Sequence, residues 1–267
     1  MITPSPLSAV PAIPESARLP PPPGVDLWCF FYEPHDAPEL LAAYDALLTD
    51  DERVRHQRFY FEKDRLLFLA TRALVRTTLS AYADLSPDAW RFDQGEHGKP
   101  FLIGEGARSG LAFNLSNTRG LVACAVSTTY ERLGVDVENV ERAGDTVGIA
   151  DRFFSPHEVD ALHALPVAEQ QRRFFSYWTL KESYIKARGM GLAIPLDQFS
   201  FLLDEGPEIG IAFDPRLDDD PSRWRFFLHQ ASPRHQLAVG VDSGGARPEL
   251  RLACVVPLRG RDREPPW

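Results

Sequence analysis

Cysteine is scarce in this chain, and no motif depends on a cysteine pair. The 267 residues contain three cysteines, Cys29, Cys124 and Cys254, which are widely spaced and form no CxxC pair. An odd number of thiols cannot all be paired within one chain, and Cys29 and Cys124 lie in apolar, strand-like runs. We therefore expect buried free thiols rather than a disulfide framework. Free thiols suit a reducing compartment, which predicts a cytoplasmic protein.

Long apolar runs and an excess of positive charge are also absent. No stretch approaches the roughly 20 apolar residues of a membrane span, and the N-terminus lacks the cationic and then hydrophobic order of a signal peptide. The formal net charge is −9, which argues against bulk nucleic-acid binding because such binding needs a basic face. We therefore expect neither a membrane nor a nucleic acid as partner.

The chain divides into two halves of similar make-up between loose ends. Residues 1–24 hold eight of the 23 prolines, which predicts a disordered or polyproline-like tail, and residues 258–267 look equally loose. The order strand, helices, strands occurs once before residue 130 and again after it. This order predicts an N-terminal subdomain at 25–130 and a C-terminal subdomain at 131–257.

Helix signals mark the two longest helical segments. Residues 50–83 are typical of helix, with a break near Phe59-Tyr60. Ser155 is in an N-cap position, and Glu158 three residues later completes a capping box. A long helix should run from about 167 to 188 and end at Gly189.

Basic residues are concentrated in the first helical segment. Seven of them stand against two acids, Glu62 and Asp64, between positions 53 and 76. The seven are Arg53, Arg55, Arg58, Lys63, Arg65, Arg72 and Arg76. Such a run is usually a solvated helix face, but in an acidic protein it is also a candidate phosphate-binding surface.

A set of carboxylates is the most informative pattern in the chain. Asp136 and Glu138 are two residues apart in a strand-like run, so their side chains point to one face. Glu182 and Lys186 are four apart in a helix-like run, so they stack one turn apart. Lys181 should point to another side of that helix. Taken separately, each pair is more typical of a solvated face or an exposed ion pair.

Together the two pairs predict a site. If the segments meet, three acids share one place, and two like charges ~4 Å apart repel by about 4 kcal/mol at an effective dielectric constant of 20. Such a cluster needs a cation or raised pKa values. Oxygen ligands without histidine or cysteine favour a hard ion such as Mg2+.

Five motifs occur in the order of a known family. They are Arg58-Phe59-Tyr60, Gly98-Lys99-Pro100, Phe113-Asn114-Leu115-Ser116, Gly134-Val135-Asp136-Val137-Glu138 and the run from Trp178 to Lys186. Over residues 50–203 the chain resembles the 4'-phosphopantetheinyl transferases of the surfactin-synthetase-activating type. The resemblance implies an α+β fold of two similar subdomains related by a pseudo-twofold, each with a small, mainly antiparallel sheet packed on helices. Two halves in one chain make a monomer natural.

The resemblance also implies a reaction and its ligands. Such enzymes transfer the 4'-phosphopantetheine arm of coenzyme A to a serine hydroxyl of an apo acyl or peptidyl carrier protein, with Mg2+, and release adenosine 3',5'-bisphosphate. By position, Asp136, Glu138 and Glu182 match the Mg2+ ligands, and Lys186 matches a lysine near the pyrophosphate. From the chemistry we hypothesise that Glu182, or a water that it orients, takes the serine proton while Lys186 offsets leaving-group charge.

Other positions match the nucleotide end of coenzyme A. Lys99 and Ser116 correspond to residues that hold this end. Asn117 is a departure, because many relatives have a histidine that contacts the 3'-phosphate, and asparagine carries no charge. The cations available to compensate are Arg53, Arg55 and Arg58.

Two other functions and one docking surface follow from the same residues. A Mg2+-dependent nuclease or phosphodiesterase would also use acids and a lysine around the metal. The other alternative is a catalytically inactive module that binds coenzyme A or a carrier protein. Such a module would have the same fold but would not catalyse transfer. For the carrier protein we expect a mixed apolar and basic docking surface near the cleft that includes part of residues 150–180, with Arg172 and Arg173 among its cations.

Overall fold

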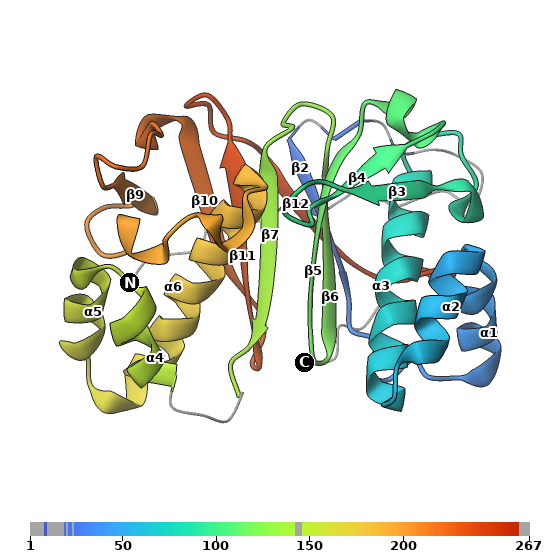
Figure 1. Ribbon diagram of the computed structural model, residues 1–267, viewed down its shortest axis with the longest axis horizontal. Helices are drawn as coiled ribbons and strands as arrows, with labels where there is room; N and C mark the ends of the chain where they lie inside the picture. The colour runs from blue at the N-terminus through green and yellow to red at the C-terminus, as the bar shows by residue number, and fades with distance from the viewer. Residues whose placement is uncertain (1–7, 10–18, 20, 23, 142–145, 262–267) are drawn as a thin grey trace. The chain divides into compact units, whose positions relative to one another are not determined.

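The computed structural model describes residues 8–9, 19, 21–22, 24–141 and 146–261, which fall into two compact units (Figure 1). Among these residues, unit 1 comprises 95–99, 132–141 and 146–248, and unit 2 comprises the remainder. Both units are α+β, with helices packed on small and mainly antiparallel sheets. The expected fold class is therefore confirmed. Within the described segments, no helix has the length and apolarity to cross a membrane.

Unit 2 has a five-strand path with three helices. Its strands, in sheet order, are β1 (Ser8–Ala9), β12 (Leu250–Val256), β2 (Val25–Phe30), β6 (Leu121–Ser127) and β5 (Ala112–Thr118), with β13 (Gly260–Arg261) paired to β12. A separate hairpin joins β3 (Arg91–Gln94) and β4 (Pro100–Ile103). The helices are α1 (Pro38–Ala46), α2 (Asp50–Arg58) and α3 (Glu62–Ser80).

Helix α3 supplies the core of unit 2. Ala70 and Leu74 are fully buried in an apolar cluster that includes Trp28 of β2 and Val122 of β6. Residues 59–61 are not helical and separate α2 from α3, so the expected interruption of the helix near Phe59-Tyr60 is confirmed. Helix α2 begins at Thr49, whose hydroxyl forms a capping box with Glu52.

Strand β12 corrects the expected domain boundary. We expected residues up to 257 in the C-terminal subdomain, but β12 pairs in parallel with β2 and so lies in unit 2. Arg251 Nε and Nη2 donate to the two carboxylate oxygens of Asp26, each at 2.6 Å. Asp26 is fully buried and also accepts from the Tyr82 hydroxyl. Because this pair joins residues 225 positions apart, no local sequence pattern predicts it.

Near both ends of the sequence, a few residues pack or pair with unit 2, which the proline content did not predict. Leu19 is buried, and its N–H donates to the carbonyl of Ala81 at 2.8 Å. Ser8–Ala9 pairs with β12, and so does Gly260–Arg261. Burial of the Leu19 side chain and strand pairing with β12 therefore hold these residues in place, although the sequence around them is rich in proline. Most of residues 1–24, and residues 262–267, lie outside the described part of the chain.

Unit 1 also packs one long helix on a sheet, and this sheet has three strands. The sheet has the order β10 (Trp224–Ser232), β11 (His235–Asp242) and β7 (Leu133–Asn139), and both pairings are antiparallel. The helices are α4 (Thr146–Phe153), α5 (Pro156–His163) and α6 (Val167–Arg188), and a hairpin joins β8 (Phe199–Leu202) to β9 (Gly210–Phe213). Figure 1 shows α6 lying along β7 and β11.

The helix ends in unit 1 follow the sequence signals. Ser155 caps α5, and its hydroxyl accepts from the backbone N–H of Glu158, whose carboxylate in turn accepts from the Ser155 N–H. Helix α6 ends at Gly189, which has φ +69°. Glycine is favoured there because other residues avoid the left-handed region. The expected capping box and the expected end of the long helix are both confirmed.

Candidate functional site

Two glycines bring α6 directly onto the sheet of unit 1. Gly134 of β7 and Gly240 of β11 are register partners. A Cβ at Gly134 would lie 2.0 Å from the carbonyl oxygen of Ser183 and 2.5 Å from the backbone N of Ala187, both in α6. A Cβ at Gly240 would lie 2.8 Å from the ring of Phe226 in β10 and 3.2 Å from the hydroxyl of Ser183. Because the atoms that face Gly134 are helix backbone, only a residue without a side chain allows this approach there.

This contact brings the predicted acids together with their lysine. Lys186 Nζ donates to Asp136 Oδ1 at 2.6 Å. The Asp136 side chain is buried, and that of Lys186 is half-buried. Glu138 lies two residues along β7, on the same strand face as Asp136, and is partly exposed. Strand β7 and helix α6 therefore form the candidate site in unit 1.

The pKa of Glu182 is shifted by its burial and by the charges of Asp136 and Lys186. Partial burial raises the pKa of its carboxyl above the ordinary value, and the negative charge of Asp136 raises that pKa further. The ammonium of Lys186 acts in the opposite direction. A raised pKa was one of the two outcomes expected of clustered carboxylates, the other being a bound cation.

The acids of this site offer oxygen ligands to a metal ion. Among the described residues, no three His, Cys, Asp or Glu side chains are arranged as a ready metal cage. Mg2+ seldom uses such a cage, since it keeps several waters and takes one or two carboxylates together with substrate phosphates. Asp136 and Glu182 are electrostatically coupled, and Lys186 already supplies positive charge there. In donor type and in charge, these residues fit a hard cation.

The neighbouring lysine of α6 has a structural place. Lys181 is fully buried, and its Nζ lies 2.7 Å from the carboxylate of the equally buried Glu158. The same ammonium donates to the carbonyls of Leu196 and Phe199, and Phe201 N–H donates to the other oxygen of Glu158. Lys181 thus points away from β7, as its spacing predicts, and ties α6 to α5 and β8.

Lys99 lies against the end of α6. Its Nζ donates to the carbonyl of Ala187 at 3.1 Å and to that of Leu133 at 3.3 Å. Burial, with a smaller contribution from the charge of Arg132, lowers the pKa of Lys99 to about 8. A cation near the last carbonyls of a helix is favourable. Lys99 therefore belongs to the same end of unit 1 as Lys186.

The remaining predicted residues lie in unit 2. Ser116 and Asn117 are neighbours in β5, where Ser116 is buried and Asn117 is exposed. Arg53 of α2 is held by Asp45, with 2.6 Å between Nη1 and Oδ2, and by the carbonyl of Leu48. Arg58 ends α2 and is exposed.

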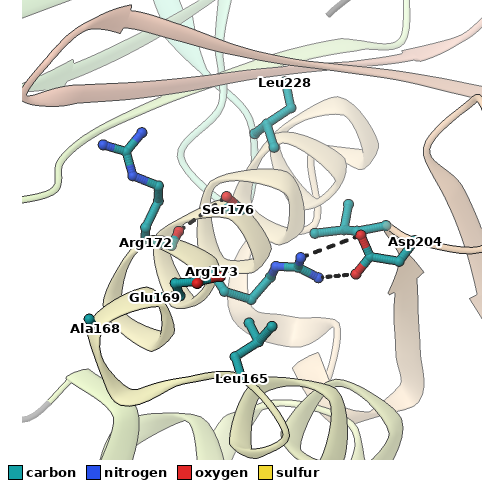
Figure 2. Close-up of a pocket in the computed structure, with 9 residues that line it drawn as sticks. Leu165, Ala168, Glu169, Arg172, Arg173, Ser176, Asp204 and Leu228 are labelled. Atoms are coloured by element: carbon teal, nitrogen blue, oxygen red, sulfur yellow. Dashed lines mark hydrogen bonds and ion pairs between the residues drawn. The ribbon is translucent and has the colours of Figure 1, made fainter. Parts of the chain in front are cut away.

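Arg172 and Arg173 line a cavity of about 450 Å³ beside α6 (Figure 2). Arg173 donates to the carboxylate of Asp204 at 2.5 Å, and Arg172 donates to Gln230 at 2.7 Å. Glu169 also lines the cavity, so two guanidinium groups meet two carboxylates there. The charges of this surface are balanced.

Sequence reasoning missed two supports of the site. Gly134 and Gly240 face one another only because β7 and β11 pair, which the sequence does not state. Glu158 was identified as a capping residue, but not as the partner of Lys181. The available signal was a charged Lys181 within an otherwise apolar face of α6.

Comparisons with known proteins agree with this description. Residues 132–241 match the 4'-phosphopantetheinyl transferase superfamily, and residues 33–129 match the family described as 4'-phosphopantetheinyl transferase, N-terminal. The chain is 42% identical over 170 residues to the 4'-phosphopantetheinyl transferase HetI of Nostoc sp., covering 63% of this chain and 70% of that protein.

Two further relatives cover more of the chain. A 4'-phosphopantetheinyl transferase of Bacillus subtilis is 34% identical over 194 residues, which is 73% of this chain and 82% of that protein. A phosphopantetheinyl transferase of Thraustochytrium sp. is 32% identical over 265 residues, covering 91% and 89%. The protein is thus a group-transferring enzyme. It belongs to the 4'-phosphopantetheinyl transferase superfamily.

Proposed function

We propose that the protein transfers the 4'-phosphopantetheine arm of coenzyme A to a serine hydroxyl of an apo acyl or peptidyl carrier protein. The second product is adenosine 3',5'-bisphosphate. Membership of the family supports the reaction class. The observation that carries the proposal is the meeting of Asp136, Glu182 and Lys186 across β7 and α6.

The reaction forms one bond and breaks one. The serine oxygen of the carrier protein attacks the phosphorus that bears the pantetheine, and the bond from this phosphorus to the bridging oxygen of the diphosphate breaks. The serine proton passes to a base, and the bridging oxygen leaves with the nucleotide. Negative charge accumulates on the leaving and non-bridging oxygens, so fixed positive charge nearby lowers the barrier.

We propose that Glu182 accepts the serine proton and that Lys186 stabilises the negative charge of the leaving group. A carboxylate with a raised pKa is a better proton acceptor than an ordinary one, which suits Glu182 as base, directly or through a water. Lys186 would offset charge on the leaving group from its place beside Asp136. The residues that would hold Mg2+ are Asp136, Glu138 and Glu182, and the ion when bound would neutralise diphosphate oxygens.

The nucleotide end of coenzyme A is assigned to a second set of residues. We propose that Lys99 and Ser116 contact it, and that Asn117 replaces a charged contact to the 3'-phosphate with a neutral hydrogen bond. Arg58 is exposed and carries the compensating charge. Arg53 is proposed as a secondary contact, because Asp45 already neutralises it.

The decisive experiment follows the carrier protein by mass spectrometry. The protein is incubated with coenzyme A, Mg2+ and a panel of apo carrier proteins, with Glu182→Gln as the matched variant. A gain of one phosphopantetheine unit that requires both coenzyme A and Mg2+ supports the proposal. Near-normal turnover of Glu182→Gln at saturating Mg2+ would remove Glu182 from the base role.

The same preparation separates the two alternatives. Cleavage of DNA or RNA in the presence of Mg2+, with no mass gain on any carrier, would indicate a nuclease. Binding of coenzyme A or carrier without transfer would indicate an inactive module.

The cellular setting and the assembly state are proposed from the cysteines and from the two units. Cys29, Cys124 and Cys254 are all free thiols, which supports a reducing compartment such as the cytoplasm. Two α+β units within one chain support a monomer. Light scattering after size-exclusion chromatography measures the assembly state directly.

A further inference from the structure

The seven basic residues of α2 and α3 separate into two groups. Three of them are paired with acids inside unit 2. Arg53 bonds to Asp45, while Arg72 and the fully buried Arg76 share Glu52, at 3.3 and 2.6 Å. These three cations hold the helices together, and their charges are compensated.

The other four point outward and lie in no ion pair among the described residues. Arg55, Arg58, Lys63 and Arg65 are all exposed. In the described part of the chain, none of the four has an ion-pair partner, although the sequence as a whole has a net charge of −9. Arg65 Nε donates to the carbonyl of Phe59, and Lys63 Nζ lies 5.4 Å from the ring centroid of Phe61. Against these four cations stand the two acids Glu62 and Asp64, so the turn between α2 and α3 keeps a net positive charge.

Two aromatic side chains stand out from the same turn. Tyr60 is 87% exposed and Phe61 is 56% exposed, and their rings meet edge to face with centroids 5.0 Å apart. The preceding Phe59 instead packs on Phe68, 5.5 Å away, in the core of unit 2. Isolated exposed aromatics are ordinary, but a paired set rimmed by unpaired cations is typical of protein-binding surfaces.

Phe61 also breaks a local rule of helix structure. It occupies the N-cap of the 19-residue helix α3 and makes no side-chain capping bond. The N-caps of α2 and α5 are Thr49 and Ser155, and both form complete capping boxes. The N-cap position favours Ser, Thr, Asp or Asn, so an exposed phenylalanine there makes the helix less stable than a capping residue would. Departures of this kind are expected where a residue serves function.

We propose that this corner patch, formed by Arg58, Tyr60, Phe61, Lys63 and Arg65, docks an acidic, amphipathic helix of the carrier protein. The inference rests on the proposed function, which supplies a protein as acceptor. Tyr60 and Phe61 contact the apolar ridge of the partner helix, and the cations face its acidic flanks. The cavity beside Arg172 and Arg173 is the other basic candidate, but Asp204 and Glu169 balance its charges.

The test measures carrier affinity and stability in the same variants. Phe61→Ser places a good N-cap on α3, so we expect the melting temperature to stay or rise while the KM for the carrier rises about tenfold. Tyr60→Ala and Lys63→Glu should raise the same KM. Arg58 is left unchanged because it is also proposed to contact coenzyme A, and the KM for coenzyme A should not move. Ile103→Ala and Arg108→Glu are matched controls, since both side chains are exposed and lie outside the patch and outside residues 150–180.

Each contrary result is distinct. If the wild-type protein transfers nothing to any carrier, the proposed function fails. If it transfers and the patch variants keep the wild-type KM for the carrier, only the docking inference fails. A rise in this KM in Arg172→Glu alone would place docking at the cavity of Figure 2. Sedimentation of the wild type, but not Phe61→Ser, with anionic phospholipid vesicles at unchanged carrier KM would make the patch a lipid-binding surface.

Discussion

A Cβ atom on Gly134 would lie 2.0 Å from the carbonyl oxygen of Ser183, so β7 and α6 are in direct backbone contact. The contact sets how α6 lies on the sheet, and therefore where Glu182 and Lys186 lie relative to Asp136. Because the obstructing atoms belong to the helix backbone, they cannot move aside as a flexible side chain would.

Gly134→Ala should consequently disturb both stability and activity. We expect a loss of about 1–3 kcal/mol in the free energy of unfolding, because the helix must shift to admit a methyl group. Urea denaturation measures the loss, and carrier modification measures the effect on the site. Gly206→Ala is the control, since a Cβ there meets nothing within 4 Å and should change stability by less than about 0.5 kcal/mol. Equal behaviour of the two variants would contradict the steric explanation.

The buried pair of Lys181 and Glu158 predicts strong non-additivity. Lys181→Met leaves the Glu158 carboxylate without its cation, and we expect a loss of about 3–5 kcal/mol. Lys181→Met combined with Glu158→Gln removes both charges and should cost less than Lys181→Met alone. A double-mutant cycle by denaturant unfolding gives the coupling energy. If the two single losses simply add, the pair is not coupled as its 2.7 Å contact indicates.

The raised pKa of Glu182 predicts how pH affects Mg2+ binding. The folded protein holds this proton more tightly than the unfolded chain, whose pKa is near 4.5. The resulting stabilisation is present below pH 4.5 and is lost as pH rises through the higher folded-state pKa. A cation competes with the same proton, so Mg2+ affinity should weaken as pH falls through that range. Calorimetry at a series of pH values from 4.5 upward tests this, and Glu182→Gln should lose this pH dependence.

Lys99 should titrate well below an ordinary lysine. Its pKa of about 8 lies below the usual 10.5, so folding favours the neutral amine. This contribution to stability is present above pH 10.5 and is lost as pH falls from 10.5 to about 8. Growth on carbon-13-labelled lysine marks all four lysines of the chain, and NMR follows each one. The signal that disappears in Lys99→Met should have its midpoint near pH 8, and a midpoint above 10 would contradict the burial of its ammonium.

Sequence patterns predicted features that depend on nearby residues. The capping box at Ser155, the end of α6 at Gly189 and the interruption after α2 are all confirmed, because each depends on a few adjacent residues. The meeting of Asp136 with Lys186 was predicted only on condition that their segments touch, and the structure supplies that contact.

Features that depend on distant pairing could not be predicted. The sequence does not indicate that β12 joins β2, because the Arg251 and Asp26 pair forms only in the folded protein. The hairpin of β3 and β4 was not predicted, because strands of only four residues show little alternation. The division of the basic run into paired and outward cations likewise required the positions of Glu52 and Asp45.

The late position of β12 also bears on how the chain is made. Unit 2 begins to emerge from the ribosome first, yet the strand that covers the edge of β2 is encoded at residues 250–256. Until residues 250–256 have been synthesised, β2 presents an uncovered strand edge, which is the kind of surface on which nascent chains associate wrongly. Productive folding in the cell therefore requires that translation has passed residue 256, after all of unit 1 has been made.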